Sequence, residues 1–368
     1  MGKHALSVDG GRGDNARVFT ITLANSGRTF PAAPGETVLE AAQRAGIALP
    51  YSCRAGVCGS CKATLLAGQC DYPRNPPVAL SGSAASEHAI LMCQAVAASD
   101  LVIAAREVTS VEDIARRRLT VEVADKQALA PDVTRLVLRP VPGATPLKWL
   151  PGQYLDVLLA EGRRRPFSIA GGPKDDGSIE LHVRHVAGGG FTSWVHEGLA
   201  PGARLHIEGP LGTFVPREDS ERPMVFMAGG TGFAPVKAIV EHFLALGTRR
   251  RMALYWGARS VDDLYLRALA ERWAREASHL DFHPVLSDPE QAAAAGLRAG
   301  LVHEAVLEDL PDLSGHEVYM SGPPAMIDAG RRLFAEAGLP DERLYFDSFD
   351  YAPDVLAQIL AGRAGIGE

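Results

Sequence analysis

The spacing of hydrophobic and polar positions changes twice along the chain and divides it into three regions. The first, from residue 17 to about 105, opens with the strand-like RVFTITL and holds one helical pattern, TVLEAAQRAGI, with Thr37 as its cap. The second holds short alternating strands separated by Gly and Pro turns, which predict an antiparallel barrel or sandwich. The charged segment 105–118 between these two regions is interpreted as a linker.

The third region begins at Arg222, where apolar strands alternate with helical patterns, as in PMVFMAGGTGFAPVKAIVEHFLALG and HEVYMSGPPAMIDAGRRLFAEAGL. This alternation is typical of a parallel sheet covered by helices. We therefore predict domains at residues 16–105, 116–218 and 222–350, preceded by a polar, Gly-rich start that we expect to be disordered.

Composition narrows the classes of function. The chain has 368 residues, of which 46% are hydrophobic, so it can bury a substantial core without disulfide bonds. Its formal net charge of -7 argues against a general nucleic-acid binder. No stretch approaches the roughly 18 apolar residues of a membrane span, and the start lacks the apolar run of a signal peptide. We therefore expect a cytoplasmic protein that does not bind membranes.

Three of the five cysteines are crowded into the segment YSCRAGVCGSC. Cys53, Cys58 and Cys61 have the spacing C-x4-C-x2-C, and Cys93 follows about thirty residues later; this is the plant-type ferredoxin spacing for a 2Fe-2S cluster. Each iron takes two thiolates, so four are needed. A structural zinc site is the alternative, but zinc motifs usually pair C-x2-C with a second close pair. Cys70 is the spare and is interpreted as a small buried residue.

Further short motifs lie in predicted strands or in the turns that follow them: RPFSIA, GGGFTSWV, MVFMAGGTGFAPV, YWGAR, MSGPPAMI and LYFDSFDY. Glycine-rich turns before helices leave N–H groups bare for a pyrophosphate, although each such turn is weak evidence alone. Because ligands bind at the carboxyl ends of the strands in open parallel sheets, we expect the loops of MVFMAGGTG, YWGAR and MSGPP to line one crevice.

In this order and spacing, the motifs resemble those of a known family. Residues 17 to about 105 resemble a plant-type ferredoxin, and 118 to about 350 resemble the ferredoxin-NADP reductase superfamily, in the arrangement of oxygenase reductase components such as those of phenol hydroxylase and methane monooxygenase. The resemblance implies a β-grasp ferredoxin domain, an antiparallel β-barrel flavin domain and a doubly wound parallel α/β nicotinamide domain. The implied cofactors are a 2Fe-2S cluster, FAD and NADH; FMN is the alternative flavin, but a pyrophosphate site favours FAD.

The resemblance also implies the residues of each cofactor site. Arg165 would hold the flavin pyrophosphate, Phe167 would pack beside the flavin ring where Tyr is usual, and Ser168 would lie near N5. Thr231, Asp347 and Phe349 join Ser168 as candidate catalytic residues, the last two as an acidic and an aromatic residue near the flavin. The other implied cofactor-binding residues are Gly189, Gly190, Thr192, Gly229, Gly230, Gly232, Gly257, Arg259, Gly322, Pro323 and Met326.

Two residues bear on how the nicotinamide coenzyme is bound. Ser321 stands in MSGPPAM where the family carries a Cys beside the nicotinamide, which affects its fine positioning. We expect NADH, not NADPH, because Asp262 and Asp263 would repel a ribose phosphate if they face it. Arg259 and Ser260 could still form a phosphate site, which leaves NADPH as the alternative.

Together the parts imply an electron-transfer reductase. Hydride transfer moves two electrons at once and a 2Fe-2S cluster accepts one, so a flavin must stand between them. The expected acceptor is a terminal oxygenase, Rieske-type or di-iron, bound transiently to a monomeric reductase through a small interface of mixed charge. One alternative is a CDP-6-deoxy-glucoseen reductase serving a pyridoxamine-dependent sugar dehydratase, and another is a non-catalytic ferredoxin-like carrier.

Overall fold

The computed structural model describes residues 17–74, 77–80, 88–111 and 114–349. The Gly-rich start that we expect to be disordered lies outside these residues. By its contacts the chain divides into two compact units, which are described separately. The first comprises Met1–Leu49 and Arg54–Glu107, and the second comprises Pro50–Cys53 and Val108–Glu368. None of the described helices is long and apolar enough to cross a membrane.

The first unit is a five-stranded mixed sheet with the order β2-β1-β7-β3-β5, against which helix α1 packs. Helix α1 (Val38–Arg44) begins where predicted, since Thr37 accepts from the Glu40 N–H while the Glu40 carboxylate accepts from the Thr37 N–H. The strands are β1 (Phe19–Leu23), β2 (Thr29–Ala32), β3 (Lys62–Ala67), β5 (Ala89–Leu91) and β7 (Leu101–Ala104), with a separate pair of β4 (Cys70–Asp71) and β6 (Val96–Ala97). The 3-10 turn η1 (Val78–Leu80) also lies in this unit, whereas the 3-10 turn η2 (Thr109–Val111) follows in the second unit.

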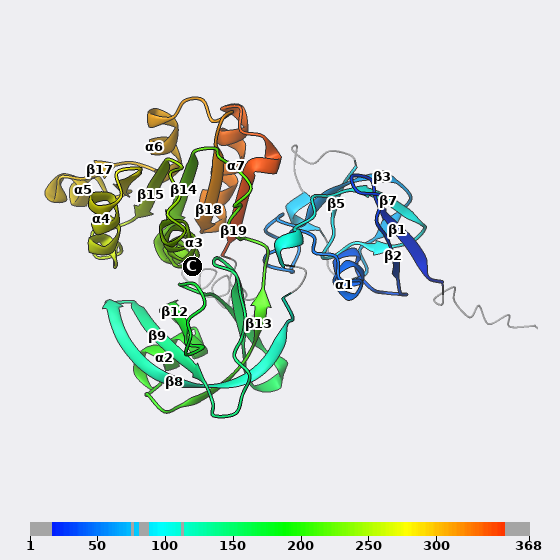
Figure 1. The fold of residues 1–368 in the computed structure, drawn as a ribbon, viewed down its shortest axis with the longest axis horizontal. Helices are drawn as coiled ribbons and strands as arrows, with labels where there is room; N and C mark the ends of the chain where they lie inside the picture. Colours follow the sequence, from blue (N-terminus) through cyan, green and yellow to red (C-terminus); the bar gives the residue numbers. More distant parts are fainter. Residues whose placement is uncertain (1–16, 75–76, 81–87, 112–113, 350–368) are drawn as a thin grey trace, which may run out of the picture. The chain divides into compact units, whose positions relative to one another are not determined.

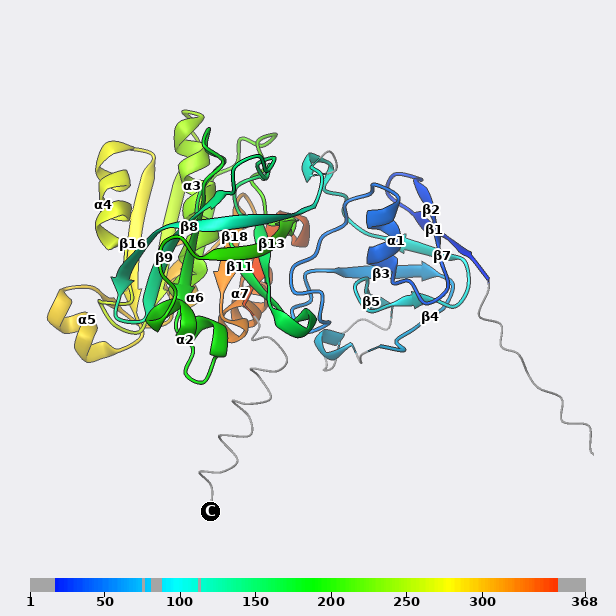
Figure 2. The ribbon, with the colours of Figure 1, turned by 90° about the horizontal axis from the view of Figure 1, so that it is seen from below.

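The second unit begins with a six-stranded antiparallel sheet in the order β11-β10-β13-β8-β9-β12. Strands β8, the longest of the sheet, and β9 form the curved ribbon seen in Figures 1 and 2, and their inward side chains pack with those of helix α2 into one core. The strands are β8 (Arg117–Ala130), β9 (Val133–Pro140), β10 (Tyr154–Leu158), β11 (Arg164–Ser168), β12 (Ile179–Arg184) and β13 (Arg204–Leu211), with the turn η3 (Ala160–Gly162).

Two features of this sheet differ from the sequence prediction. Helix α2 (Gly190–Glu197) begins within the glycine turn of GGGFTSWV and not after it, because the glycine turn itself adopts the helical conformation. Strand β13 was not predicted, because the Gly209-Pro210 pair inside it has the composition of a turn.

The rest of the second unit is a parallel sheet in the order β17-β16-β15-β14-β18-β19. Helices α3, α4 and α5 pack on one face around Phe226, and α6 and α7 pack on the other face around Met227, so the sheet is covered on both sides as predicted. The strands are β14 (Met224–Gly229), β15 (Met252–Ala258), β16 (Leu280–Leu286), β17 (Arg298–Ala299), β18 (Glu317–Gly322) and β19 (Leu344–Ser348). The helices are α3 (Phe233–Ala245), α4 (Arg267–Glu276), α5 (Pro289–Ala295), α6 (Val302–Asp309) and α7 (Pro324–Glu336), with 3-10 turns η4 (Gly230–Gly232) and η5 (Asp341–Arg343).

A buried polar network joins the two sheets of the second unit. The Lys237 ammonium on α3 donates to the Ala170 carbonyl at 2.7 Å and to Glu241 at 3.0 Å, and it lies 3.4 Å from Glu180 of β12. Glu180 also accepts from Nε2 of His182 at 3.0 Å. Because every charge in this network has a partner, the network can hold the two sheets together without leaving an isolated buried ion.

Candidate redox cofactor sites

The cysteine loop brings several of the predicted cluster ligands together. Cys58, Cys61 and Cys93 are buried, and the thiols of Cys61 and Cys93 are hydrogen-bonded to one another. That bond, together with burial, raises the pKa of the Cys61 thiol. Among the described residues, no three His, Cys, Asp or Glu side chains converge as ligands of one ion would. Two thiolates at each iron are what a two-iron cluster requires, so the paired thiols fit that group.

The backbone of the loop is shaped for wrapping a compact group. Arg54, Gly56 and Gly59 have φ angles of 58°, 80° and 75°, in the left-handed region that glycine tolerates best. The side-chain amide of Gln94 donates to the Arg54 carbonyl at 2.9 Å and reaches the Cys93 sulfur at 3.7 Å. Gln94 was missed in the sequence, although a buried amide next to Cys93 in the apolar segment ILMCQA is the signal that could have found it.

Two cysteines, Cys53 and Cys70, lie in places that the sequence alone does not lead us to expect. Cys53 falls within Pro50–Cys53, which belongs to the second unit by its contacts. Cys70, predicted to be buried, is half-buried in β4, where its side chain hydrogen-bonds with that of Tyr72. The surface position follows from β4 pairing with only one neighbour, β6.

The two flavin motifs meet at the start of helix α2. The ring of Phe167 on β11 lies 5.5 Å from the ring of Phe191 on α2, and both pack into the barrel core. A Cβ built at Gly190 would meet no described atom within 4 Å, and no described side chain caps this helix. Open space beside uncapped N–H groups fits a pyrophosphate. The Thr192 hydroxyl is engaged in its own loop, where it accepts from the Val186 N–H at 3.1 Å.

Arg165 lies half-buried on β11, and its Nη1 donates to the carbonyl of Arg164 at 2.9 Å. The structure therefore places Arg165 on the edge strand of the barrel sheet, within the same motif as Phe167 and Ser168. Its predicted bond to the flavin pyrophosphate stays a prediction.

The glycine-rich loop after β14 is packed against the loop after β18. A Cβ at Gly229 would lie 2.7 Å from the Met326 sulfur, and one at Gly232 would lie 2.0 Å from the Ser321 carbonyl oxygen. These glycines are therefore required first by loop-to-loop packing, whereas Gly230 faces more open space. Gly257, two residues before Arg259, is required for the same reason, because a Cβ built there would lie 2.7 Å from the Cβ of Val302.

Two further features mark this edge of the sheet as a binding site. The Trp256 indole stacks 3.7 Å from the Phe233 ring and donates to the Gly230 carbonyl at 3.0 Å, which fixes the loop that carries Thr231. The Ser321 hydroxyl is fully buried and has no hydrogen-bond partner among the described residues. A buried hydroxyl without a partner costs free energy, so it fits a site whose ligand supplies that partner.

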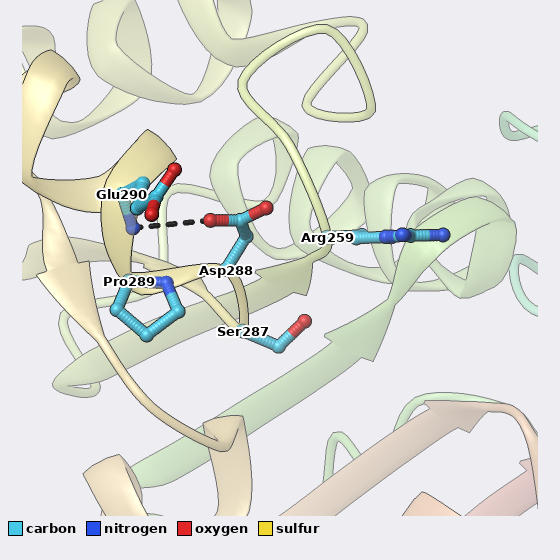
Figure 3. Close-up of a pocket in the computed structure, with 5 residues that line it drawn as sticks. All are labelled: Arg259, Ser287, Asp288, Pro289 and Glu290. Atoms are coloured by element: carbon cyan, nitrogen blue, oxygen red, sulfur yellow. Dashed lines mark hydrogen bonds between the residues drawn. The ribbon is translucent and has the colours of Figure 1, made fainter.

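A cavity of about 590 Å³ opens beside this edge, at the carboxyl ends of β15 and β16 (Figure 3). It is lined by Arg259, Ser287, Asp288, Pro289 and Glu290. Asp288 caps α5 by accepting from the Glu290 N–H at 3.0 Å. Of these residues the sequence prediction included only Arg259, although S-D-P-E after an apolar strand is a helix-start signal.

The structure shows the partners of Asp263, one of the two aspartates expected to favour NADH. Asp263 does not line the cavity: its carboxylate pairs with Arg184 at 2.9 Å and accepts from the Ser260 hydroxyl at 2.9 Å. The acidic side chains at the cavity are instead Asp288 and Glu290, which come from the next strand and helix.

Two of the predicted catalytic residues are in direct contact. Asp347 is buried at the end of β19, where one carboxylate oxygen accepts from the Ser168 hydroxyl at 3.2 Å and the other from the Ser52 hydroxyl at 2.5 Å. Burial raises the pKa of Asp347 to about 6. The Phe349 N–H donates to the Gly322 carbonyl at 2.9 Å, which continues the pairing of β19 with β18 beyond Ser348. The catalytic role of Thr231 and the roles of Asp347 and Phe349 near the flavin stay predictions.

Comparison with known proteins matches each part of the chain to a family. Residues 21–98 match the 2Fe-2S iron-sulfur cluster binding domain, 120–215 the oxidoreductase FAD-binding domain and 226–332 the oxidoreductase NAD-binding domain. The chain thus carries domains for a 2Fe-2S cluster, FAD and NADH, and the fold class is confirmed.

Relatives span almost the whole chain. The CDP-6-deoxy-L-threo-D-glycero-4-hexulose-3-dehydrase reductase of Yersinia pestis is 37% identical over 331 residues, covering 90% of this chain and 98% of that protein. Terephthalate 1,2-dioxygenase reductase component 2 of Comamonas is 35% identical, with coverage of 90% and 98%. The crystal structure of the Amycolatopsis cytochrome P450 reductase GcoB superposes with a TM-score of 0.71 at 35% identity, covering 90% and 98%. The chain therefore belongs to the family of oxidoreductases that combine a 2Fe-2S cluster domain with FAD-binding and NAD-binding domains.

Proposed function

We propose that this chain is the NADH-dependent reductase component of an oxygenase system, which delivers electrons from NADH to a partner protein. The observation that carries the proposal is that one chain holds the sites for a two-electron donor and for a one-electron carrier. The chemistry that FAD supplies when bound is exchange of two electrons with NADH and of single electrons with the cluster.

We assign the protein's own residues the following parts in this function. Arg165 and the N–H groups at the start of α2 hold the flavin pyrophosphate. The Ser321 hydroxyl, which has no partner within the described part of the chain, hydrogen-bonds the bound nicotinamide, and Trp256 keeps the glycine loop in place for it. Cys53, Cys58, Cys61 and Cys93 hold the cluster. The domain boundaries at 16–105, 116–218 and 222–350 belong to the same proposal and bracket the three family matches.

The partner we propose is a terminal oxygenase that binds transiently to a reductase monomer in the cytoplasm, where thiols stay reduced. Support comes from the relative named as a terephthalate dioxygenase reductase and from the solved cytochrome P450 reductase. The second candidate partner is a CDP-hexulose dehydrase, favoured by the 37% identical Yersinia relative. Size-exclusion chromatography with light scattering tests whether the reductase is a monomer.

The experiment is reconstitution with purified protein. We expect one 2Fe-2S cluster and one FAD per chain, and reduction of cytochrome c that depends on NADH. Zinc in place of iron, or no reduction with NADH, would contradict the proposal. The reductase is then mixed separately with an oxygenase and with a CDP-hexulose dehydrase, each encoded by a gene next to that of the reductase. If product forms only with the dehydrase, the dehydrase and not the oxygenase is the partner.

Coenzyme preference is tested in the same assay. The acidic side chains of Asp288 and Glu290 at the cavity favour a higher kcat/KM with NADH than with NADPH. Equal efficiency with the two coenzymes would contradict this assignment.

A further inference from the structure

The segment Pro50–Cys53, which ends at the first cysteine of the cluster motif, is bound along its length within the second unit. The Tyr51 N–H donates to the Thr213 hydroxyl at 3.0 Å, and the same hydroxyl donates to the Tyr51 carbonyl at 3.2 Å. The Ser52 carbonyl accepts from the Tyr154 hydroxyl at 2.9 Å. The Ser52 side chain donates to Asp347 at 2.5 Å. Both backbone and side chain are therefore held just before Cys53.

Neighbouring barrel strands supply these contacts because of their register. Tyr154 on β10 pairs with Ser168 on β11 and, on its other side, with Leu211 on β13. Thr213 follows Leu211 after a glycine, Gly212, at which a Cβ would lie 2.8 Å from the Tyr154 ring. The register thus places Ser168, Tyr154 and Thr213 at the same end of the barrel sheet.

The parallel sheet supplies the remaining contact. Asp347 on β19 lies opposite Ser321 on β18, so it stands at the edge of the sheet where the nicotinamide loops end. Its two carboxylate oxygens are shared between Ser168 of the flavin motif and Ser52. One carboxylate therefore ties the flavin motif to the residue that precedes Cys53.

Ser52, Asp347, Tyr154 and Thr213 are each no more than 6% exposed. Buried hydroxyls and carboxylates lose their hydration, so geometry that satisfies all of them is strongly preferred over displaced alternatives. The Cα of Cys53 lies one peptide, about 3.8 Å, from that of Ser52, so fixing Ser52 restricts where the Cys53 sulfur can go.

We propose that Ser52 is a positioning residue for Cys53, with Tyr154 and Asp347 holding it in place, so that this cluster ligand has a fixed position. This inference rests on the proposed function. It adds to the cysteines a supporting set that acts through Cys53. Side chains that orient metal ligands typically contribute ten- to a hundredfold to activity or metal affinity, which sets the scale of the expected effect.

The test uses the full-length holoenzyme carrying Ser52→Ala or Tyr154→Phe. Both substitutions remove one hydroxyl, and Tyr154→Phe leaves the contacts of Asp347 untouched. Ser178→Ala is the matched serine control, because the buried Ser178 hydroxyl hydrogen-bonds Asp176 in the same unit. Tyr265→Phe is the matched tyrosine control, because its hydroxyl bonds only with His182 among the described contacts. The readouts are FAD content, the NADH–ferricyanide rate, the NADH–cytochrome c rate and the EPR spectrum of the dithionite-reduced cluster.

We expect Ser52→Ala and Tyr154→Phe to keep FAD and ferricyanide reduction within twofold of the parent. Their cytochrome c rates should fall about tenfold and their EPR g-values should shift, while both controls match the parent. Unchanged cytochrome c rates and EPR spectra would overturn the inference, and so would equal losses with both acceptors. If the parent itself failed to reduce cytochrome c, the proposed function would fall instead.

Discussion

The cysteine loop and the flavin–nicotinamide site are built in opposite ways. In the first, Cys58 and Cys61 come from one short segment, completed by Cys93 and braced by Gln94. In the second, each residue comes from a different strand end: Ser168 from β11, Gly229 from β14, Arg259 after β15 and Asp347 from β19. A locally built site depends on a few covalent ligands, whereas an assembled site depends on the packing of a whole sheet.

This difference predicts how each site fails. Removing one ligand should destroy the loop site outright, because a cluster has no substitute for a missing thiolate. The assembled site should weaken in steps, because each strand end contributes part of the binding free energy. The following predictions are ordered from the largest expected effect to the smallest.

Replacing Cys93 with Ser should abolish cluster binding and leave the assembled site intact. Iron content and the cytochrome c rate should fall to background, while FAD content and ferricyanide reduction stay within twofold of the parent. Iron analysis and the two acceptor assays measure this. Cys70→Ser is the control, since Cys70 lies outside the motif and is half-buried in β4. A Cys93 variant that reduced cytochrome c at the parent rate would show that the cluster is not the exit for electrons.

Replacing Lys237 with Met tests whether the assembled site depends on the joint between its two sheets. The substitution removes the ammonium 3.4 Å from Glu180, which keeps its ion pair with Arg135 at 3.0 Å, and leaves the buried Ala170 carbonyl without this donor, at a cost of about 1 to 3 kcal/mol. FAD fluorescence on heating should show release at a lower temperature, whereas the EPR spectrum of the cluster should not change. The exposed Lys62 on β3, replaced by Met, is the control. An unaltered release temperature would argue that the two sheets need no such joint.

Replacing Arg165 with Ala should weaken a single contribution to the assembled site. Loss of a charge-assisted contact of about 2 to 3 kcal/mol corresponds to roughly hundredfold weaker FAD binding. Titration of the apoprotein with FAD measures the change, and added FAD should restore both acceptor activities. The exposed Arg163 nearby, replaced by Ala, serves as control. Unchanged FAD affinity would remove Arg165 from the proposed pyrophosphate site.

Lowering the pH should destabilise the second unit through the same buried network. Burial lowers the pKa of His182, which donates from Nε2 to Glu180 and faces Tyr265 at Nδ1. The pKa of Glu180 also lies below its usual value, with His182 and Lys237 outweighing burial. In both cases the unfolded chain binds protons first, so stability is present above about pH 6.5 for His182 and is lost as the pH falls.

The measurement is the temperature of FAD release at pH 7, 6 and 5, compared between the parent and His182→Gln. We expect the parent value to fall with pH and the variant value to fall less. Parallel curves would mean that His182 does not contribute.

The cluster cysteines and the order of the domains follow from the sequence because both are local. The C-x4-C-x2-C spacing lies within one segment, and runs of residues such as VFMAGG are buried strands in any parallel sheet. The helix cap at Thr37 was predictable for the same reason, since the capping box needs only four consecutive residues.

What the sequence could not determine is which side chains meet. Ser52 and Asp347 are separated along the chain by almost the whole second unit, and their contact depends on the register of β10, β11, β18 and β19. The same holds for the cavity at the ends of β15 and β16, which is lined by Asp288, whereas Asp263 pairs with Arg184. Sequence spacing determines chemistry within a loop, but contacts between loops are set by strand order and register, which only the folded sheets decide.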